Sequence, residues 1–157
     1  DEGGGGRGEK ALSFESAMLG VGFNYPAGWT PREYSEGLVE VSPEEALDRA
    51  KVSVYSEDLT GASYGLEDWM RDRADELDSQ GWPYESGYAV LLGQQAGQFV
   101  FSYLGEASAG YKVMDVFTVV GDTAYIVSYI ALEEDFDTYL GGAETVINSM
   151  EMLGGSR

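Results

Sequence analysis

Histidine and cysteine are both absent from this chain, and each absence removes a group of catalytic centres. Without a thiol there is no cysteine nucleophile. Without an imidazole there is no histidine base and no catalytic triad that depends on one. Structural zinc sites lose their usual nitrogen and sulfur ligands for the same reason. The composition therefore predicts a protein that is not an enzyme.

Basic residues are scarce: 9 Lys and Arg stand against 28 Asp and Glu, which gives a formal net charge of −19. A field of this sign repels phosphate groups, so we expect no binding to nucleic acid or to an anionic membrane surface. It favours cationic partners and divalent metals, although solubility or tolerance of high salt would explain the same charge. The chain also lacks an apolar run of about 18 residues, so no transmembrane segment is predicted.

The first ten residues read DEGGGGRGEK, and four consecutive glycines between charged residues predict a flexible linker. We interpret 1–17 as this linker, 18–153 as a single folded domain and 154–157 as a C-terminal tail. Because the chain starts at Asp1 rather than Met, we expect that a segment has been removed upstream. A lipid anchor on a cysteine just before Asp1 would make the linker a membrane tether, and the alternative is a disordered tail.

Alternation of apolar and polar side chains predicts a series of β-strands and an α+β fold, in which an antiparallel sheet is flanked by helices. The expected strands cover 22–25, 38–42, 51–56, 88–92, 98–104, 111–120 and 124–132. The turn at Gly121-Asp122 predicts a hairpin between the last two strands. Both faces of these two strands are largely apolar, which is typical of central strands.

Two helices are predicted by apolar residues at helical spacing, over 64–80 and over 138–151. Gly81 is the expected stop of the first helix. In the second, Gly141 and Gly142 weaken the first turn by roughly 1 kcal/mol each relative to Ala. That helix should therefore depend on packing against the sheet.

A dense group of acidic residues is expected on the loop between the last strand and the last helix: Glu133, Glu134, Asp135 and Asp137. Their carboxylates could supply oxygen ligands to Ca²⁺. The spacing, however, lacks the regular aspartate pattern of a dedicated calcium loop. The alternative is a solvated helix entry, because acidic side chains suit the positive end of the helix dipole.

Three further residues are candidates for a ligand site. Asp115 stands mid-strand among apolar residues, where a buried carboxylate is a candidate functional group. Its alternatives are an exposed strand face or a local hydrogen bond. Tyr125 and Tyr129 share one strand face and could line a groove for a small apolar or sugar ligand, or could be amphipathic core tyrosines.

The order of several motifs resembles that of PsbP-like domains, the photosystem II extrinsic proteins and their bacterial relatives. FNYPAGW at 23–29 resembles the family's aromatic-x-aromatic-Pro-x-Gly-Trp opening. AYIVSY at 124–129, EDFD at 134–137 and VINSM at 146–150 resemble its closing strand, acidic-aromatic link and final helix. The resemblance implies an α/β/α-like sandwich, an extracytoplasmic or lumenal location, often as a lipoprotein, and accessory rather than enzymatic work. It assigns no functional residue.

The function predicted from all this is a non-enzymatic, extracytoplasmic accessory or binding domain, tethered to a membrane surface by its N-terminus. Its partner would be a protein or another component of the cell envelope. One alternative is a module that responds to Ca²⁺ through the acidic group. Another is a small hydrolase that uses carboxylates, which requires two acids facing each other in a pocket.

Overall fold

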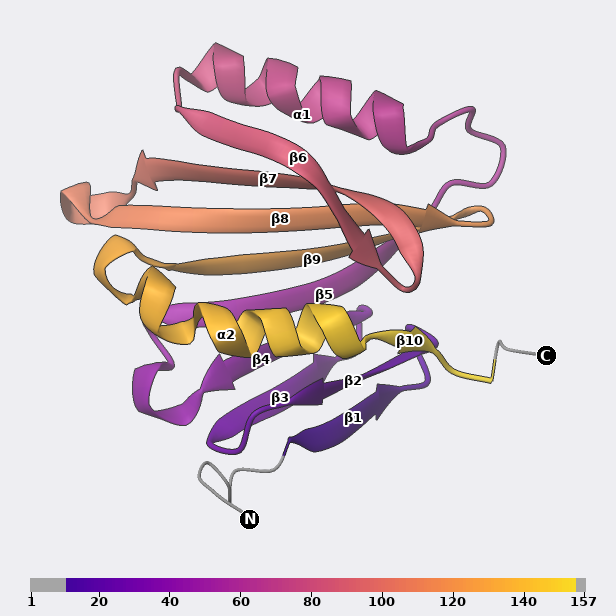
Figure 1. Ribbon diagram of the computed structural model, residues 1–157, viewed down its shortest axis with the longest axis horizontal. Helices are drawn as coiled ribbons and strands as arrows, with labels where there is room; N and C mark the ends of the chain where they lie inside the picture. The colour runs from indigo at the N-terminus through magenta and orange to yellow at the C-terminus, as the bar shows by residue number, and fades with distance from the viewer. Residues whose placement is uncertain (1–10, 155–157) are drawn as a thin grey trace.

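The computed structural model describes residues 11–154, which form two antiparallel β-sheets and two helices (Figure 1). The large sheet has seven strands in the order β3-β4-β5-β9-β8-β7-β6, and the small sheet has three in the order β1-β2-β10. The predicted α+β class is confirmed. The predicted hairpin is also confirmed, and its second strand, β9, lies at the centre of the large sheet.

The elements follow one another along the chain without a long irregular segment. The strands are β1 (Leu12–Ser16), β2 (Val21–Tyr25), β3 (Trp29–Tyr34), β4 (Leu38–Pro43), β5 (Ala50–Asp58), β6 (Tyr84–Leu91), β7 (Gln94–Leu104), β8 (Gly110–Val120), β9 (Thr123–Leu132) and β10 (Glu151–Met152). The helices are α1 (Leu66–Gln80) and α2 (Glu133–Ser149), with short 3-10 turns at Glu44–Ala46 and Glu106–Ser108. None of the helices in this described stretch is long and apolar enough to cross a membrane.

The two helices lie on opposite faces of the large sheet, and the small sheet packs beside α2. The face under α2 is closed by apolar side chains from several strands, because alternate residues of a strand point to the same side. Its completely buried valines are Val39, Val41, Val52, Val54, Val116 and Val127. Helix α2 covers them with Phe136, Ala143, Val146 and Ile147. We call this side of the sheet the closed face.

Helix α2 begins at Glu133, five residues before the predicted start, so the acidic group is not on a loop. Glu133, Glu134 and Asp135 form its first turn, where carboxylates interact favourably with the exposed N–H groups. The sequence-based boundary was wrong because a run of acidic residues is equally typical of a loop and of a helix N-terminus. Helix α1 ends as predicted, at Gly81, which adopts φ 76°.

Gly142 is unfavourable for an isolated helix but is required for the packing of α2 on the sheet. A Cβ atom there would overlap the indole ring of Trp29. Helix α2 can therefore approach the start of β3 closely only because Gly142 has no side chain. This contact explains why a residue that weakens an isolated helix stands in the middle of α2.

The predicted linker over 1–17 is too long, because Leu12–Ser16 forms strand β1 and pairs with β2. Phe14 and Phe23 lie opposite each other in this pair, with ring centroids 5.6 Å apart. The strand is stabilised by its pairing with β2, and the pattern of five residues does not reveal such a partner. The glycine run, and the tail beyond residue 154, lie outside the described residues.

Candidate binding groove

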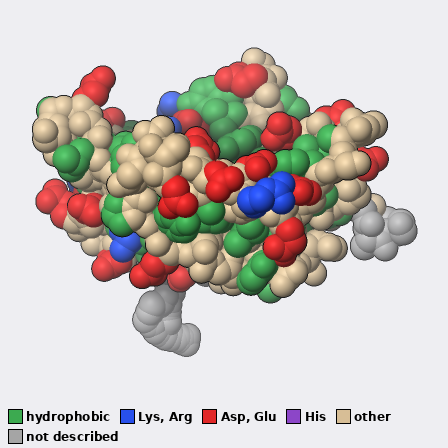
Figure 2. Space-filling model, turned by 90° about the horizontal axis from the view of Figure 1, so that it is seen from above, with side chains coloured by type: hydrophobic (Ala, Val, Ile, Leu, Met, Phe, Trp, Pro, Cys, Tyr) green, Lys and Arg blue, Asp and Glu red, His purple; other side chains and the backbone are tan. Residues whose placement is uncertain are grey.

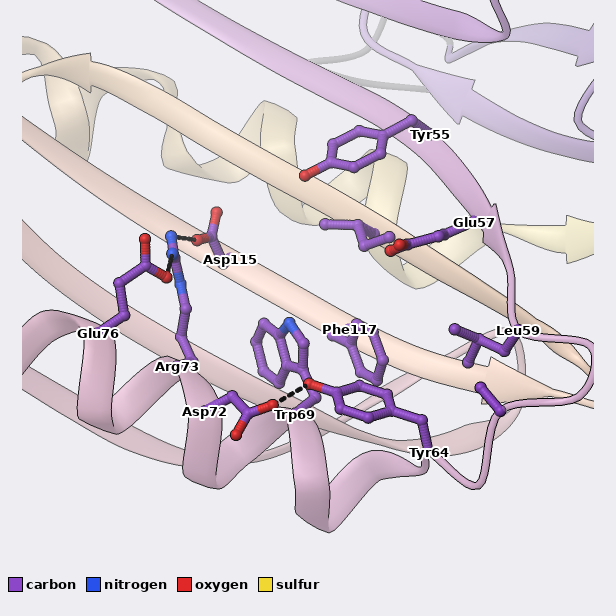
Figure 3. Close-up of a pocket in the computed structure, with 12 residues that line it drawn as sticks. Tyr55, Glu57, Leu59, Tyr64, Trp69, Asp72, Arg73, Glu76, Asp115 and Phe117 are labelled. Carbon is purple, nitrogen blue, oxygen red and sulfur yellow. Dashed lines mark hydrogen bonds and ion pairs between the residues drawn. The ribbon is translucent and has the colours of Figure 1, made fainter.

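Helix α1 covers only part of its face of the large sheet. It packs on β7 and β8, and Figure 1 shows it at the end of the sheet far from β3 and β4. Within residues 11–154 no helix lies over β3, β4 and β5 on this side. We call this side the open face. The step between α1 and β5 forms a groove of about 460 Å³ (Figure 3).

The groove is built from two stretches of the chain, one from β5 to α1 and the other in the β8–β9 hairpin. Its residues are Tyr55, Glu57, Leu59, Ala62 and Tyr64 from β5 and the following loop, Trp69, Asp72, Arg73 and Glu76 from α1, and Asp115, Phe117 and Ile126 from β8 and β9. Helical spacing places the α1 residues on two adjacent turns, and strand alternation places the residues of β5, β8 and β9 on one face of the sheet. The lining is therefore a mixture of aromatic and acidic side chains.

An aromatic wall forms one side of the groove. The Trp69 ring stacks on Phe117 with centroids 4.5 Å apart and planes 3° apart. It also meets Phe99 edge-on at 5.5 Å. These contacts fix the indole in place, since aromatic rings gain from both stacked and edge-on packing. Across the groove on β5, Tyr55 leaves 40% of its surface exposed.

Asp115 lies at the floor of the groove and is 5% exposed. Arg73 donates a hydrogen bond from Nη2 to Asp115 at 2.5 Å and another from Nη1 to Glu76 at 2.7 Å. The guanidinium also lies over the Phe101 ring, 5.2 Å from its centroid. Burial by itself lowers the pKa of Arg73, but the carboxylates of Asp115 and Glu76 outweigh it and the net shift is upward. The buried carboxylate is thus neutralised by an ion pair.

Tyr64 closes the loop end of the groove. Its hydroxyl donates to Asp72 at 2.8 Å. Burial and this hydrogen bond to a carboxylate raise the pKa of Tyr64 to about 12. The phenol therefore stays protonated and holds Asp72 in place.

Glu57 differs from the other acids of the groove. Figure 3 shows its side chain reaching in from β5, opposite the α1 side. Among the described residues, Glu57 has neither a hydrogen-bond nor an ion-pair partner. It is exposed, so its charge is available to a ligand.

Tyr125 and Tyr129, the predicted groove tyrosines, do not belong to this groove. They point to the closed face, where Tyr125 is 6% exposed and Tyr129 is fully buried. The Tyr129 hydroxyl donates to the Phe136 carbonyl at 2.8 Å. Burial, with nearby carboxylates, raises the pKa of Tyr129. Both residues are core tyrosines, the alternative that strand alternation left open, and the structure does not bring them together with Asp115.

The four acids of the predicted calcium site lie at the N-terminal end of α2, three of them in its first turn and Asp137 just after it. Asp135 forms an ion pair with Arg49, with Nε and Oδ2 3.0 Å apart, while Glu133, Glu134 and Asp137 are exposed. Within residues 11–154, no three acidic side chains are grouped so that they could hold a metal ion. Calcium binding stays a prediction, and a calorimetric titration would test it.

Sequence reasoning identified one residue of the groove, Asp115, and missed its surroundings. Arg73 is 42 positions away in the chain, so no local pattern links the two. Tyr55 could have been found, because it continues the outward-pointing series of Lys51 and Ser53 on β5. Trp69 belongs to the apolar stripe of α1, which shows burial but not that one edge of the ring borders a groove.

No protein-family model and no curated protein matches the chain. Several solved structures resemble it, among them the following three. LpqN, involved in cell envelope biogenesis of Mycobacterium tuberculosis, has a TM-score of 0.68 and 16% identity, over 92% of this chain and 91% of LpqN. A Bacteroides thetaiotaomicron protein has a TM-score of 0.65 and 20% identity, over 92% of this chain and 49% of that one. The cyanobacterial PsbP protein CyanoP of Synechocystis sp. PCC 6803 has a TM-score of 0.62 and 16% identity, over 90% of this chain and 92% of CyanoP.

These similarities show that the chain has the PsbP-like fold, as the motifs at 23–29 and 124–150 predicted. Identities of 16–20% establish the fold and leave function to be argued from the site. The chain spans about half (49%) of the length of the Bacteroides protein.

Proposed function

We propose that this chain is a non-enzymatic, extracytoplasmic binding domain that holds its partner in the groove between α1 and β5. The observation that carries the proposal is the groove itself, about 460 Å³ in volume and lined by four aromatic residues and by Glu57, a carboxylate without a partner in the part of the chain that the structure describes. Concave sites of this size with a few well-placed polar groups are where proteins commonly bind ligands. The closed face has no comparable role, because its side chains are buried in the core.

The bonding within the groove supports binding over hydrolysis. A carboxylate-dependent hydrolase needs one acid free to donate a proton and another free to act as base or nucleophile. The groove does contain four acids, but Arg73 holds both Asp115 and Glu76, and Tyr64 hydrogen-bonds to Asp72. Only Glu57 remains without such a partner in the described part of the chain, and one free carboxylate does not make the required pair.

Site-directed photocrosslinking in cells of the native host tests where the partner binds. A benzoylphenylalanine probe at position 55 points into the groove, and the same probe at Thr138, exposed on α2, is the matched control. We expect a discrete crosslinked species from position 55 that is absent from position 138. Equal crosslinking at both positions, or none at position 55, would overturn the proposal.

The location and the tether are part of the same proposal. LpqN is described as involved in cell envelope biogenesis, and this chain opens with a glycine-rich segment that suits a tether. Protease treatment of intact host cells, or of spheroplasts where an outer membrane is present, tests this point. We expect the native protein to sediment with membranes and to be degraded without cell lysis. Protection until the cytoplasmic membrane is broken would contradict an extracytoplasmic location.

A further inference from the structure

The charges that line the groove are strongly unbalanced. Four of its twelve lining residues are acidic, and Arg73 is the single basic one. Arg73 is already bonded to Asp115 and Glu76, and Asp72 lies 3.8 Å from Arg71 Nε. Within residues 11–154 this leaves Glu57, on the β5 side, as the acid of the groove without an ionic partner. The chain as a whole carries a net charge of −19, so the net charge of the rest of the molecule has the same sign as that of the groove. A negatively charged cleft of this kind concentrates cations and repels anions.

The uncharged part of the lining suits a cation that has an apolar stem. Phe117 and Ile126 form an apolar floor, and the rings of Tyr55 and Trp69 stand on its two sides. Aromatic rings attract ammonium and guanidinium groups through their negatively charged faces. A lysine side chain combines a compact charge with a four-carbon stem that can lie on apolar surface.

The open face extends beyond the groove and is large enough for a polypeptide. A second hollow of about 460 Å³ includes Leu47, Lys51 and Ile130, and a third of about 440 Å³ includes Arg32 and Lys51. Lys51 and Tyr55 are four residues apart on β5, a separation of about 13 Å along a strand. A small free amine would occupy only one of these three hollows, whereas a partner protein would cover all three. The extent of the open face therefore favours a protein as the partner.

Figure 2 shows the molecule from the α1 side, with acidic side chains scattered over the surface and few basic ones among them. General attraction to this surface must be separated from recognition in the groove. Glu57 makes that separation possible, because it can lose its charge without breaking any contact among the described residues.

We propose that the groove binds a lysine side chain of a protein partner, with its ammonium group on Glu57 and its stem on Phe117 and Ile126. This inference rests on the proposed binding function and specifies the chemistry that the site recognises. An arginine or an uncharged side chain of similar length should bind less well. Arginine presents a wide planar group instead of a point charge, and the uncharged side chain leaves Glu57 without a partner.

The indole N–H signals of the tryptophans provide a local readout by NMR. Trp69 borders the groove, whereas Trp29 is buried in the closed face. The probe is the capped hexapeptide acetyl-GGKKGG-amide, titrated in about 0.15 M salt to screen long-range attraction. We expect the Trp69 signal to shift with peptide and the Trp29 signal to stay. The same peptide with norleucine or arginine in place of lysine should give shifts at least five times smaller at equal concentration.

Two variants with equal net charge complete the test. Glu57→Gln should weaken binding of the lysine peptide at least fivefold, and Glu85→Gln, at an exposed position of β6, should leave it unchanged. Equal weakening in both variants would show general charge attraction and overturn the inference. So would equal binding of the norleucine peptide. If Trp69 never responds to lysine peptide while position 55 still crosslinks to a partner, the lysine inference fails and the binding function stands. If both are absent, both fail.

Discussion

The closed and open faces of the large sheet are formed by the same strands but differ in almost every physical respect. On β5, Val52 and Val54 are completely buried on the closed face, whereas Tyr55 and Glu57 border the groove on the open face. On β8, Val116 is buried on the closed face, whereas its neighbour in sequence, Asp115, forms an ion pair with Arg73 on the open face. The contrast arises because successive residues of a strand point to opposite sides.

The difference separates stability from binding within one sheet. Removing apolar surface from water stabilises the fold by about 25 cal/mol per Å², and the closed face contributes most of this burial. The open face is free to hold polar and aromatic groups, because α1 covers only part of it. A substitution should therefore affect folding or binding according to the face on which it falls.

The largest loss of stability is expected at the Arg73–Asp115 ion pair, because Asp115 is a buried charge on a face that is otherwise partly exposed. Arg73→Met leaves the carboxylate of Asp115 buried without a partner and should destabilise the protein by about 3–5 kcal/mol. Adding Asp115→Leu removes the unpaired charge and should restore much of that loss. Urea unfolding of the two variants measures both values. If the double variant is no more stable than Arg73→Met alone, the ion pair is not the cause.

Neighbouring residues on β5 give a direct comparison of the two faces. Val54→Ser removes methyl groups from the core and buries a hydroxyl, which should cost about 3 kcal/mol. Tyr55→Ser, at a side chain that is 40% exposed, should cost about 1 kcal/mol or less. Thermal unfolding followed by circular dichroism measures both. Similar losses would mean that the open face is as tightly packed as the closed one.

Three glycines test how closely each helix approaches the sheet. Gly142→Ala should destabilise by about 2 kcal/mol, because the new methyl group meets the rigid Trp29 ring. Gly97→Ala, under α1, overlaps the side chain of Met70, which can move, and meets Leu66 and the Trp69 ring only at 3.1 and 3.2 Å, so its cost should be smaller. Gly141→Ala faces open space and should stabilise α2 by up to about 1 kcal/mol. Denaturant unfolding measures the stability of the three variants. If Gly141→Ala were less stable than Gly142→Ala, the packing of Trp29 on α2 would be contradicted.

The smallest effect concerns the ionisation of Tyr64 in the groove. Its pKa is raised to about 12 by burial and by its hydrogen bond to Asp72. The protonated phenol therefore contributes stability that is fully present below pH about 10 and is lost as the pH rises towards 12. The ultraviolet absorbance of tyrosinate follows the titration. Tyr64→Phe should remove one late-ionising group, and Asp72→Asn should shift it to lower pH, whereas an unchanged curve would refute the contact.

Part of the fold could be predicted because the relevant signals are local. The alternation on β4 and β5, the apolar stripe of α1 and the stop at Gly81 each follow from a few consecutive residues. The start of α2 could not be predicted, because the acidic run at 133–137 suits both a loop and a helix N-terminus. Strand β1 was missed because a five-residue strand gains its order from its partner, β2.

The sequence by itself determined the strongly acidic character, the absence of thiol and imidazole chemistry, and which residues of each strand share a face. These properties depend on composition and on the period of the backbone. Only the tertiary structure decided that Arg73 neutralises Asp115, that Gly142 makes room for Trp29 and that Glu57 borders an open groove. Each of these depends on where α1 and α2 lie on the sheet. Their positions follow from packing between residues that are distant in the chain, which no local pattern records.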